Sequence, residues 1–379
     1  MKVEQTSWSS ATEWQPAAPG RAGLSPQLVL AFGSRAALQT PGLIDQIRRA
    51  YPAAHITGCS TAGEICDTRV YDDSVVVTAI AFKDTPLTIA AVHLSEKLSN
   101  EEVGAQLGRQ LQSSDLRHVL LLSDGLHVNG SELVRGVSSV LPASVSITGG
   151  LSADGAKFEQ TVVLVNGALQ DRVVVGIGLR GSSIRVGYGS VGGWDTFGPE
   201  LVVTRAHGNV LHELDGQSAL GLYRRYLGDH ASDLPASGLL FPLSIRTDRE
   251  SHGVVRTILA VSDEEDTMTF AGDIVEGSFA RLMRANFDRL IDGAAGAAKI
   301  SAGAIAGQSA ELALLISCVG RKMVLKQRVE EEVEGVRDVV GPDTTLAGFY
   351  SYGEISPFTP SAKCELHNQT MTITTLAEV

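Results

Sequence analysis

Three short stretches, GCSTAGE (Gly58–Glu64), GGLSADG (Gly149–Gly155) and GFYSYGE (Gly348–Glu354), decide the fold of this chain. Each stretch follows an apolar run and a segment with helical periodicity, and each precedes a further apolar run. A strand–helix–strand unit that occurs three times in one chain indicates internal repetition. We therefore expect an α/β (α+β) fold in which internally repeated strand–helix–strand units form two packed β-rich halves with helices.

The apolar runs on either side of these stretches are the expected strands. The opening strands are LVLAFGS (Leu28–Ser34), HVLLLSDG (His118–Gly125) and LALLISCVG (Leu312–Gly320). The strands expected to follow the glycine-rich stretches are SVVVTAIAF (Ser74–Phe82), TVVLVNG (Thr161–Gly167) and QTMTITTL (Gln369–Leu376).

The chain of 379 residues is long enough for two domains. Residues 1–25 have no apolar core and predict a flexible N-terminal arm, followed by domains at 26–200 and 201–379. The boundary is placed at GGWDTFGPE, where the β-rich pattern breaks. Beyond it, residues 254–274 predict a hairpin with its turn at Asp263–Asp266, and SFARLMRANFDRLI (278–291) has the period of a helix.

Composition excludes several classes of function. The net charge is −12 without a basic stripe, and only 5% of residues are aromatic, which argues against nucleic-acid and anionic-membrane partners. No apolar run reaches the ~20 residues of a membrane-spanning helix. The four cysteines form no CxxC pair, which is typical of a reducing compartment. We expect a cytoplasmic protein without membrane insertion.

The glycine-rich stretches predict a ligand site. Glycines let a ligand approach the main chain, and loops at strand ends of α/β folds gather into clefts. Glu64 and Glu354 would bind an ammonium group there and Arg321 a carboxylate, unless the two glutamates cap neighbouring turns. The residues expected to bind ligand are Gly58, Cys59, Ser60, Gly63, Glu64, Arg321, Tyr350, Ser351, Tyr352 and Glu354.

An enzyme is the alternative of another class, a hydrolase or transferase that uses Cys59, Ser60 or Cys318. The stretch GCSTAG resembles a nucleophile elbow but misses the G-x-S-x-G spacing, and no base and orienting residue can be assembled from spacing. We therefore expect no enzymatic activity. GIGLRG (Gly176–Gly181) fits G-x-G-x-x-G, but a strand follows it where a dinucleotide site needs a helix.

Metal chemistry leaves only a weak signal. His207 and His212 lack a third ligand in a known pattern, and the absence of C-x-x-C-H excludes covalent c-type haem. A b-type haem needs one axial histidine and leaves no spacing signature. The candidates are His252, His127 and His367.

The chain resembles the FIST family of sensory domains over nearly its whole length after about residue 25. The N-terminal part of the resemblance lies in GCSTAGEI, LLLSDGLHVNGSELVRG and ITGGLSADGAKFEQTVVLVNG. The C-terminal part lies in LHELDGQSALGLYRRYLG, ISCVGRKMVLKQRVEEEVEG, GFYSYGEISPF and CELHNQTMTITTL.

The resemblance implies a bacterial small-ligand sensor in signal transduction. A chain of the two FIST parts alone is similar to the stand-alone nitric-oxide sensors of the family, NosP. Those bind b-type haem through a histidine and regulate a partner histidine kinase, and so biofilm formation. His127 departs from the family pattern, whereas the context of His367 fits it; His252 is the preferred ligand. A haem-free sensor that binds an amino acid through Glu64, Arg321 and Glu354 stays open, as does a homodimer.

Overall fold

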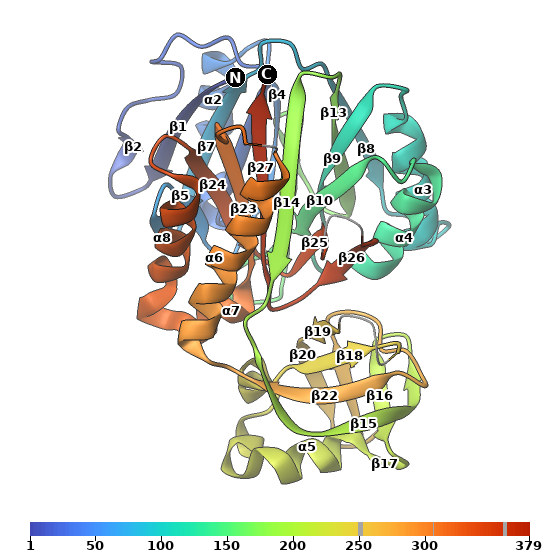
Figure 1. Ribbon diagram of the computed structural model, residues 1–379. Coiled ribbons are helices and arrows are strands. Elements are labelled where there is room, and N and C mark those ends of the chain that lie inside the picture. Colours follow the sequence, from blue (N-terminus) through green and yellow to red (C-terminus); the bar gives the residue numbers. More distant parts are fainter. Residues whose placement is uncertain (249–252, 306, 359–361) are drawn as a thin grey trace.

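The computed structural model describes residues 1–248, 253–305, 307–358 and 362–379. The chain forms a large body and a smaller lobe, with the two termini close together at the end of the body far from the lobe (Figure 1). The structure describes three sheets in the body and one in the lobe. Among these residues, no helix has the length and apolar character needed to cross a bilayer.

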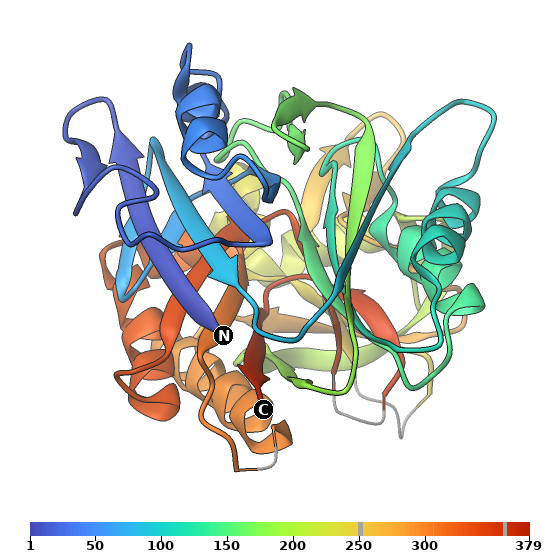
Figure 2. The ribbon, with the colours of Figure 1, turned by 90° about the horizontal axis from the view of Figure 1, so that it is seen from above.

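The three predicted repeats are present and share one topology. In each repeat the first strand lies between a parallel second strand and an antiparallel third strand. Viewed from above, the lobe lies beneath the body that the repeats build (Figure 2). The strands are β3 (Leu28–Gly33), β4 (His55–Ser60) and β7 (Ser74–Ala81), then β9 (Leu116–Ser123), β10 (Ser146–Leu151) and β13 (Val173–Arg180), then β23 (Leu312–Cys318), β24 (Thr345–Ser351) and β27 (Met371–Glu378).

One expected strand has a different role. The third strand of the second repeat is β13, whereas TVVLVNG forms the short strand β11 (Val163–Val165), which pairs with β4 of the first repeat. Each repeat in fact sends a hairpin into the sheet of another repeat. The exchanged hairpins are β5 (Glu64–Cys66) with β6 (Arg69–Tyr71) onto β24, β11 with β12 (Ala168–Gln170) onto β4, and β25 (Gly353–Pro357) with β26 (Cys364–His367) onto β10.

Helices cover the outer faces of these sheets. Within the repeats, Ser34 caps α1 and Asn129 caps α4 through their side-chain oxygens. The other body helices are α2, α3, α6, α7 and α8, and α6 lies so close to β14 that a Cβ on Gly187 would come within 2.0 Å of the Ser301 carbonyl oxygen. The bounds are α1 (Arg35–Leu38), α2 (Leu43–Ala50), α3 (Asn100–Leu111), α4 (Gly130–Val140), α6 (Phe287–Ala304), α7 (Val319–Leu325), α8 (Val329–Val340), β8 (Leu87–His93) and β14 (Ile184–Val191).

The N-terminal residues are not a flexible arm, so this expectation was wrong. Strand β1 (Lys2–Ser9) pairs with β7 along its whole length, and β2 (Glu13–Gln15) pairs back on β1. The Thr6 hydroxyl donates to the carbonyl oxygens of Gln15 (2.9 Å) and Ala17 (2.6 Å). The open edge of β7 supplies the hydrogen bonds that order this polar segment, and a local apolar pattern is not required for such pairing.

The small lobe is an insertion between β14 and α6. Its sheet has the order β19-β18-β22-β15-β16-β21-β20, and its edge strands β19 and β20 are separated in sequence only by Thr257. The lobe therefore curls towards a barrel around a core of its own. Its elements are β15 (Asp195–His207), β16 (Val210–Leu214), β17 (Gln217–Ser218), α5 (Ala219–Leu227), β18 (Leu243–Arg246), β19 (Val254–Arg256), β20 (Ile258–Ser262), β21 (Thr267–Phe270) and β22 (Phe279–Arg284), with short 3-10 turns at Gly228–Asp233, Ala236–Leu240 and, in the body, Lys326–Arg328.

The predicted split at residues 200 and 201 falls inside β15, the first strand of the lobe, and does not divide the chain into two separate bodies. Residues 287–379 return to the body and complete the third repeat. The hairpin around Asp263–Asp266 is confirmed, since it joins β20 to β21. The segment 278–291, expected to be one helix, instead contains β22 and the start of α6.

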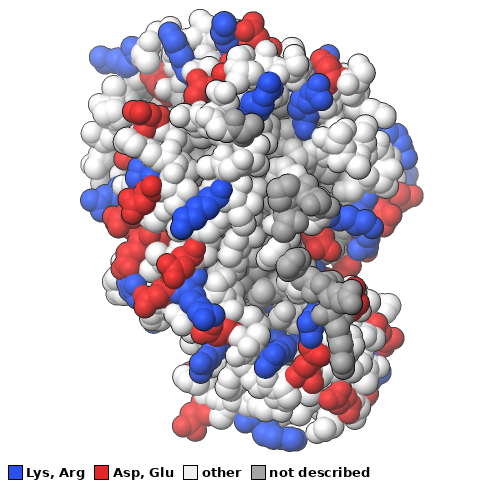
Figure 3. Space-filling view, in the orientation of Figure 1, with Lys and Arg blue, Asp and Glu red and all other residues white. Residues whose placement is uncertain are grey.

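Positive and negative side chains are interspersed over the body and the lobe on the face shown in Figure 3.

Candidate functional site

The three glycine-rich stretches meet at the carboxyl ends of the parallel strands. Equivalent residues of the three stretches form a cyclic set of backbone hydrogen bonds, in which each stretch donates to the next. The bonds run from Ala62 N to Tyr350 O (2.9 Å), from Ala153 N to Ser60 O (2.8 Å) and from Tyr352 N to Leu151 O (3.3 Å). The repeats thus have approximate threefold symmetry at this end of the body.

The leading glycine of each stretch allows two strands to approach closely. Each one lies directly opposite a residue of the first strand of its repeat, and an added Cβ would come within about 2 Å of that residue's carbonyl oxygen. The pairs are Gly58 with Ala31 (1.8 Å), Gly149 with Leu121 (2.0 Å) and Gly348 with Leu315 (1.8 Å). Gly58 therefore serves strand pairing, and not the approach of a ligand.

Glu64 is buried and fully engaged by hydroxyl groups. Thr61 donates to its Oε1 at 2.5 Å and Ser74 to its Oε2 at 2.6 Å. Burial raises the pKa of Glu64 from 4.5 to about 7. Next to it, Gly63 packs against Lys322, whose Nζ would lie 2.4 Å from an added Cβ.

Glu354 repeats this arrangement in the third stretch. Ser351 donates to its Oε1 at 2.7 Å, and Thr370 donates to its Oε2 from Oγ1 at 2.9 Å and from its backbone N at 3.2 Å. Burial raises the pKa of Glu354 from 4.5 to about 8. Both glutamates therefore tie the turn to the neighbouring strand, which is the alternative left open by the sequence. In the second stretch Gly155 takes this position, and the buried hydroxyl of Ser152 has no partner among the described residues.

Arg321 is not available to a ligand carboxylate, which corrects the prediction. It is fully buried and paired with the equally buried Glu332, through Nε at 3.0 Å and Nη2 at 2.7 Å. Its remaining contacts are to the carbonyl oxygens of Gly192, in one connection between body and lobe, and of Leu290, in the first turn of α6 just beyond the other connection. Tyr350 also faces this pair, since its hydroxyl donates to Glu332 at 2.7 Å. Arg321 thus anchors the hinge of the lobe.

The predicted nucleophiles lie in settings that disfavour nucleophilic attack. Cys59 and Cys318 are buried, and burial raises the pKa of both thiols well above the usual range, which keeps them protonated. The buried Ser60 hydroxyl oxygen accepts a hydrogen bond from Val162 N at 3.0 Å. Cys59 and Ser60 are the last two residues of β4, and Cys318 is the last residue of β23.

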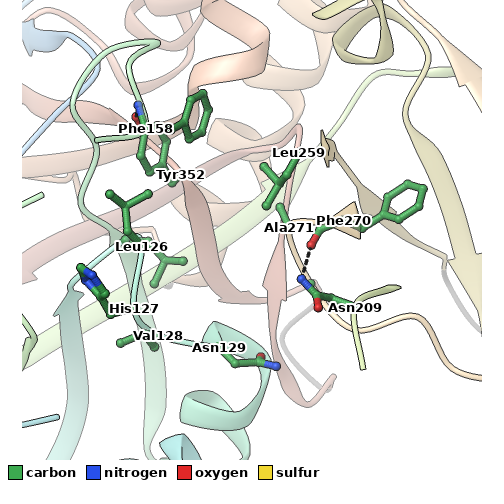
Figure 4. Close-up of a pocket in the computed structure, with 13 residues that line it drawn as sticks. Leu126, His127, Val128, Asn129, Phe158, Asn209, Leu259, Phe270, Ala271 and Tyr352 are labelled. Atoms are coloured by element: carbon green, nitrogen blue, oxygen red, sulfur yellow. Dashed lines mark hydrogen bonds between the residues drawn. The ribbon is translucent and has the colours of Figure 1, made fainter. Parts of the chain in front are cut away.

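A cleft between the body and the lobe lies near the predicted loops. It has two adjoining parts of about 320 and 430 Å³. Both parts are lined by Leu126, Phe158 and Tyr352 of the body and by Leu259 and Ala271 of the lobe (Figure 4). Of the residues predicted to bind ligand, Tyr352 is the one that lines both parts of this cleft. The volume of each part lies in the range typical of small-molecule sites.

Tyr352 and Phe158 form the aromatic part of the cleft wall. Their rings stack with centroids 4.3 Å apart, and Phe158 remains 43% exposed. The Tyr352 hydroxyl donates to the Asp154 carboxylate and accepts from Phe158 N at 3.2 Å. Asp154 also accepts from the backbone N of Glu159 (2.9 Å) and Gln160 (2.8 Å). The hydrogen bonds of Asp154 and Tyr352 therefore fix the conformation of the loop that carries Phe158.

The three candidate haem ligands have different settings. His127 lies at the edge of the cleft, on the loop that carries Leu126 (Figure 4), and its Nδ1 contacts the buried Asp124 carboxylate at 3.1 Å. His367 is buried away from solvent; its Nε2 contacts Ser356 O at 2.8 Å, and burial lowers its pKa to about 4. His252 lies outside the described residues. Within the described part of the chain, no three His, Cys, Asp or Glu side chains are placed to hold a metal ion together.

Three hydrogen bonds hold the lobe against the body beside the cleft. Asp273 of the lobe accepts hydrogen bonds from Asn129 at 2.8 Å and from Arg135 at 3.2 Å, both on the α4 side of the body. Arg256 of the lobe donates to Leu366 O of the body at 3.0 Å. We call the contacts of Asp273 the latch. The latch adjoins the cleft directly, because Asn129 is itself one of the residues that line the 320 Å³ part.

Sequence reasoning missed the lobe side of the cleft. Leu259 and Ala271 lie in the predicted hairpin, but nothing in its strand pattern indicates that it faces another body. Phe158 lies inside the quoted block SADGAKFEQ, and an aromatic residue in a polar loop was the available signal.

Comparison with known families gives two matches. The FIST N domain matches residues 27–217 and the FIST C domain matches residues 219–357. Comparison with curated proteins gave no match. The FIST C match therefore spans most of the lobe and continues into the third repeat of the body.

Proposed function

Because the chain belongs to the FIST family, whose domains are small-ligand sensors in signal transduction, we propose that its ligand binds in the cleft between body and lobe and that binding changes how the two are arranged. The observation that carries this proposal is the position of the cleft. Its lining comes from both bodies, so a ligand that contacts both walls binds one arrangement better than another.

The two connections between body and lobe provide the hinge. They run through Gly192–Trp194 and through Ala285–Asn286, and the Arg321 guanidinium contacts Gly192 in one connection and Leu290 just beyond the other. Gly193 has φ +86°, and a Cβ there would come within 2.0 Å of the Arg289 carbonyl oxygen. The latch lies at the other side of the interface. A ligand in the cleft would therefore change the distance between body and lobe by rotation about the hinge, with the hydrogen bonds of the latch forming or breaking.

The output we propose is regulation of a partner histidine kinase in the cytoplasm, by preferential binding to one arrangement of body and lobe. The test is autophosphorylation of a kinase that binds the purified chain, with Asp273→Ala as the variant that opens the latch. We expect this variant to shift kinase activity away from the wild-type level in the direction opposite to ligand. The surface variant Leu98→Ser, away from the cleft, should leave it unchanged. Equal kinase activity with wild type and Asp273→Ala would contradict the proposal.

Haem b is the second candidate occupant, and one observation favours it. The Nδ1 of His127 contacts Asp124, so Nε2 is the nitrogen left for iron, as in histidines oriented by a carboxylate. A bound haem would supply an iron that binds nitric oxide, and the Tyr352–Phe158 pair would contact its ring. Haem titration should give a Soret band that nitric oxide shifts and that His127→Ala or His252→Ala removes, whereas the exposed His55→Ala does not. A spectrum that all three variants retain would remove both histidines as ligands.

The amino-acid alternative loses the residues on which it was built. Glu64 and Glu354 are saturated by hydroxyl and backbone donors, and Arg321 is paired with Glu332. An amino acid in the cleft would need other partners.

A further inference from the structure

We propose that the cleft takes a neutral, mainly apolar aromatic molecule that carries one hydrogen-bonding group, and not a zwitterion. This rests on the proposed function, because it names the class of ligand for the same cleft. The evidence lies in the 430 Å³ part of the cleft, between the loop at Phe158, the start of α7 and the lobe strand β20.

The lining of this part has no charged side chain among its described residues. Its walls are aliphatic and aromatic, and three large side chains in it stay exposed. Phe158 is 43% exposed, Leu259 41% and Met323 37%. Large apolar side chains gathered in one concave place are the usual mark of a site for an apolar ligand.

Four charged groups near the cleft are already satisfied within the protein. Asp154 accepts from Tyr352 and from three backbone N–H groups, and Asp124 accepts from the backbone N–H groups of its own loop. Arg321 and Glu332 neutralise each other out of reach of solvent. An ammonium and a carboxylate brought into this cleft would lose water without gaining partners, and that loss is costly.

Thr257 supplies an unpaired polar group in the 430 Å³ part of the cleft. It lines the cleft, is more than nine-tenths buried, and its hydroxyl has no partner among the described residues. The other polar side chain, Tyr352, already has its hydroxyl engaged by Asp154. One N–H or O–H group on an otherwise apolar ligand therefore matches the one unpaired hydroxyl.

The test uses N-phenyl-1-naphthylamine, a neutral aromatic amine whose fluorescence rises in apolar surroundings. We expect saturable binding with one site per chain, and displacement by indole but not by L-tryptophan at the same concentration. Indole and L-tryptophan share a ring and differ in the zwitterionic group. L-Tryptophan displacing the probe as well as indole does would overturn the proposal, and so would an absence of saturable binding.

Two variants test whether the probe binds in the cleft. Leu259→Ser should weaken probe binding at least tenfold, whereas Leu98→Ser, at a leucine with similar exposure (37%) outside the cleft, should not change it. Thr257→Val keeps the shape and should weaken indole binding about fivefold while leaving naphthalene, which has no N–H, unchanged. Probe binding that is equal in wild type and Leu259→Ser refutes the site, provided that both variants unfold at the wild-type temperature.

Two further outcomes separate this proposal from the others. Haem that displaces the probe and gives a Soret band dependent on His127 assigns the cleft to haem and refutes the neutral ligand. The chain with Trp8→Phe and Trp14→Phe keeps Trp194, at the hinge, as its fluorescent reporter. Indole binding without any change in Trp194 emission or kinase activity supports the ligand class and counts against the proposed sensor mechanism.

Discussion

Replacement of Arg321 by methionine should show how much stability the hinge anchor provides. The substitution keeps most of the volume but leaves the Glu332 carboxylate buried without its cation. It also removes the donors to the Gly192 and Leu290 carbonyl oxygens. Removal of one partner from a buried ion pair costs about 3–5 kcal/mol, so we expect the free energy of unfolding to fall by about that amount.

The double variant Arg321→Met with Glu332→Gln separates charge from shape. The amide oxygen introduced by Glu332→Gln would still accept hydrogen bonds from Tyr350 and Ser317, and no buried charge would remain. We expect this variant to recover roughly 2 kcal/mol of the loss in Arg321→Met, because the carbonyl oxygens of the hinge still lack their donor.

Urea unfolding followed by circular dichroism measures both values. The control is Arg328→Met, which removes a half-exposed pair with Asp288 and Glu331 and should cost at most about 1 kcal/mol. A loss in Arg321→Met no larger than the loss in the control would refute the assignment of Arg321 as the buried anchor. So would a double variant less stable than Arg321→Met.

Three further predictions test other parts of the structure. Burial raises the pKa of Glu354 to about 8, so the folded state retains a proton that the unfolded state releases. The free energy of unfolding should therefore fall as the pH rises from about 5 to about 8, and it should fall less in Glu354→Gln. Chemical denaturation at a series of pH values measures both. Asp273→Ala should increase the radius of gyration measured by small-angle scattering, at a cost of about 1 kcal/mol in stability; an unchanged radius would mean that the latch does not hold the lobe. Gly348→Ala should destabilise by about 3 kcal/mol or more because its Cβ meets a strand carbonyl. Gly303→Ala, in the last turn of α6 where an added Cβ meets no atom within 4 Å, should be neutral or stabilising by up to about 1 kcal/mol; similar melting temperatures would contradict this.

The repeated units could be predicted because their signals are local. Each leading glycine is needed for a close approach to a strand of the same repeat, so glycine and apolar spacing recur in the sequence. The hairpin exchange could not be predicted in this way. Which strand edge β11 joins depends on pairing between segments far apart in the chain, and local periodicity carries no information on that. The same reason applies to β1, which is ordered by the edge of β7.

The residues of the site could be predicted only in part. The sequence predicts Glu64, Glu354 and Arg321 as ligand-binding residues, but it does not say whether a charged side chain points to a cleft or to a buried partner. Tyr352 lines the cleft, because strand ends of a repeated α/β fold gather on one side, and its contact with a ligand stays a prediction. Leu259 could not be found, because its role arises only when the inserted lobe folds back over the body.

Because the three repeats exchange hairpins, the body cannot be divided into smaller folding units, whereas the lobe can be separated from it. No repeat can be cut out as a stable fragment, because each leaves one sheet incomplete and carries a hairpin without its sheet. The lobe has its own core and is connected through two neighbouring crossings, so joining Gly193 to Ala285 should leave a body that still folds. The chain therefore combines an indivisible scaffold with a replaceable part, and a change of lobe would alter one wall of the cleft while the scaffold stays the same.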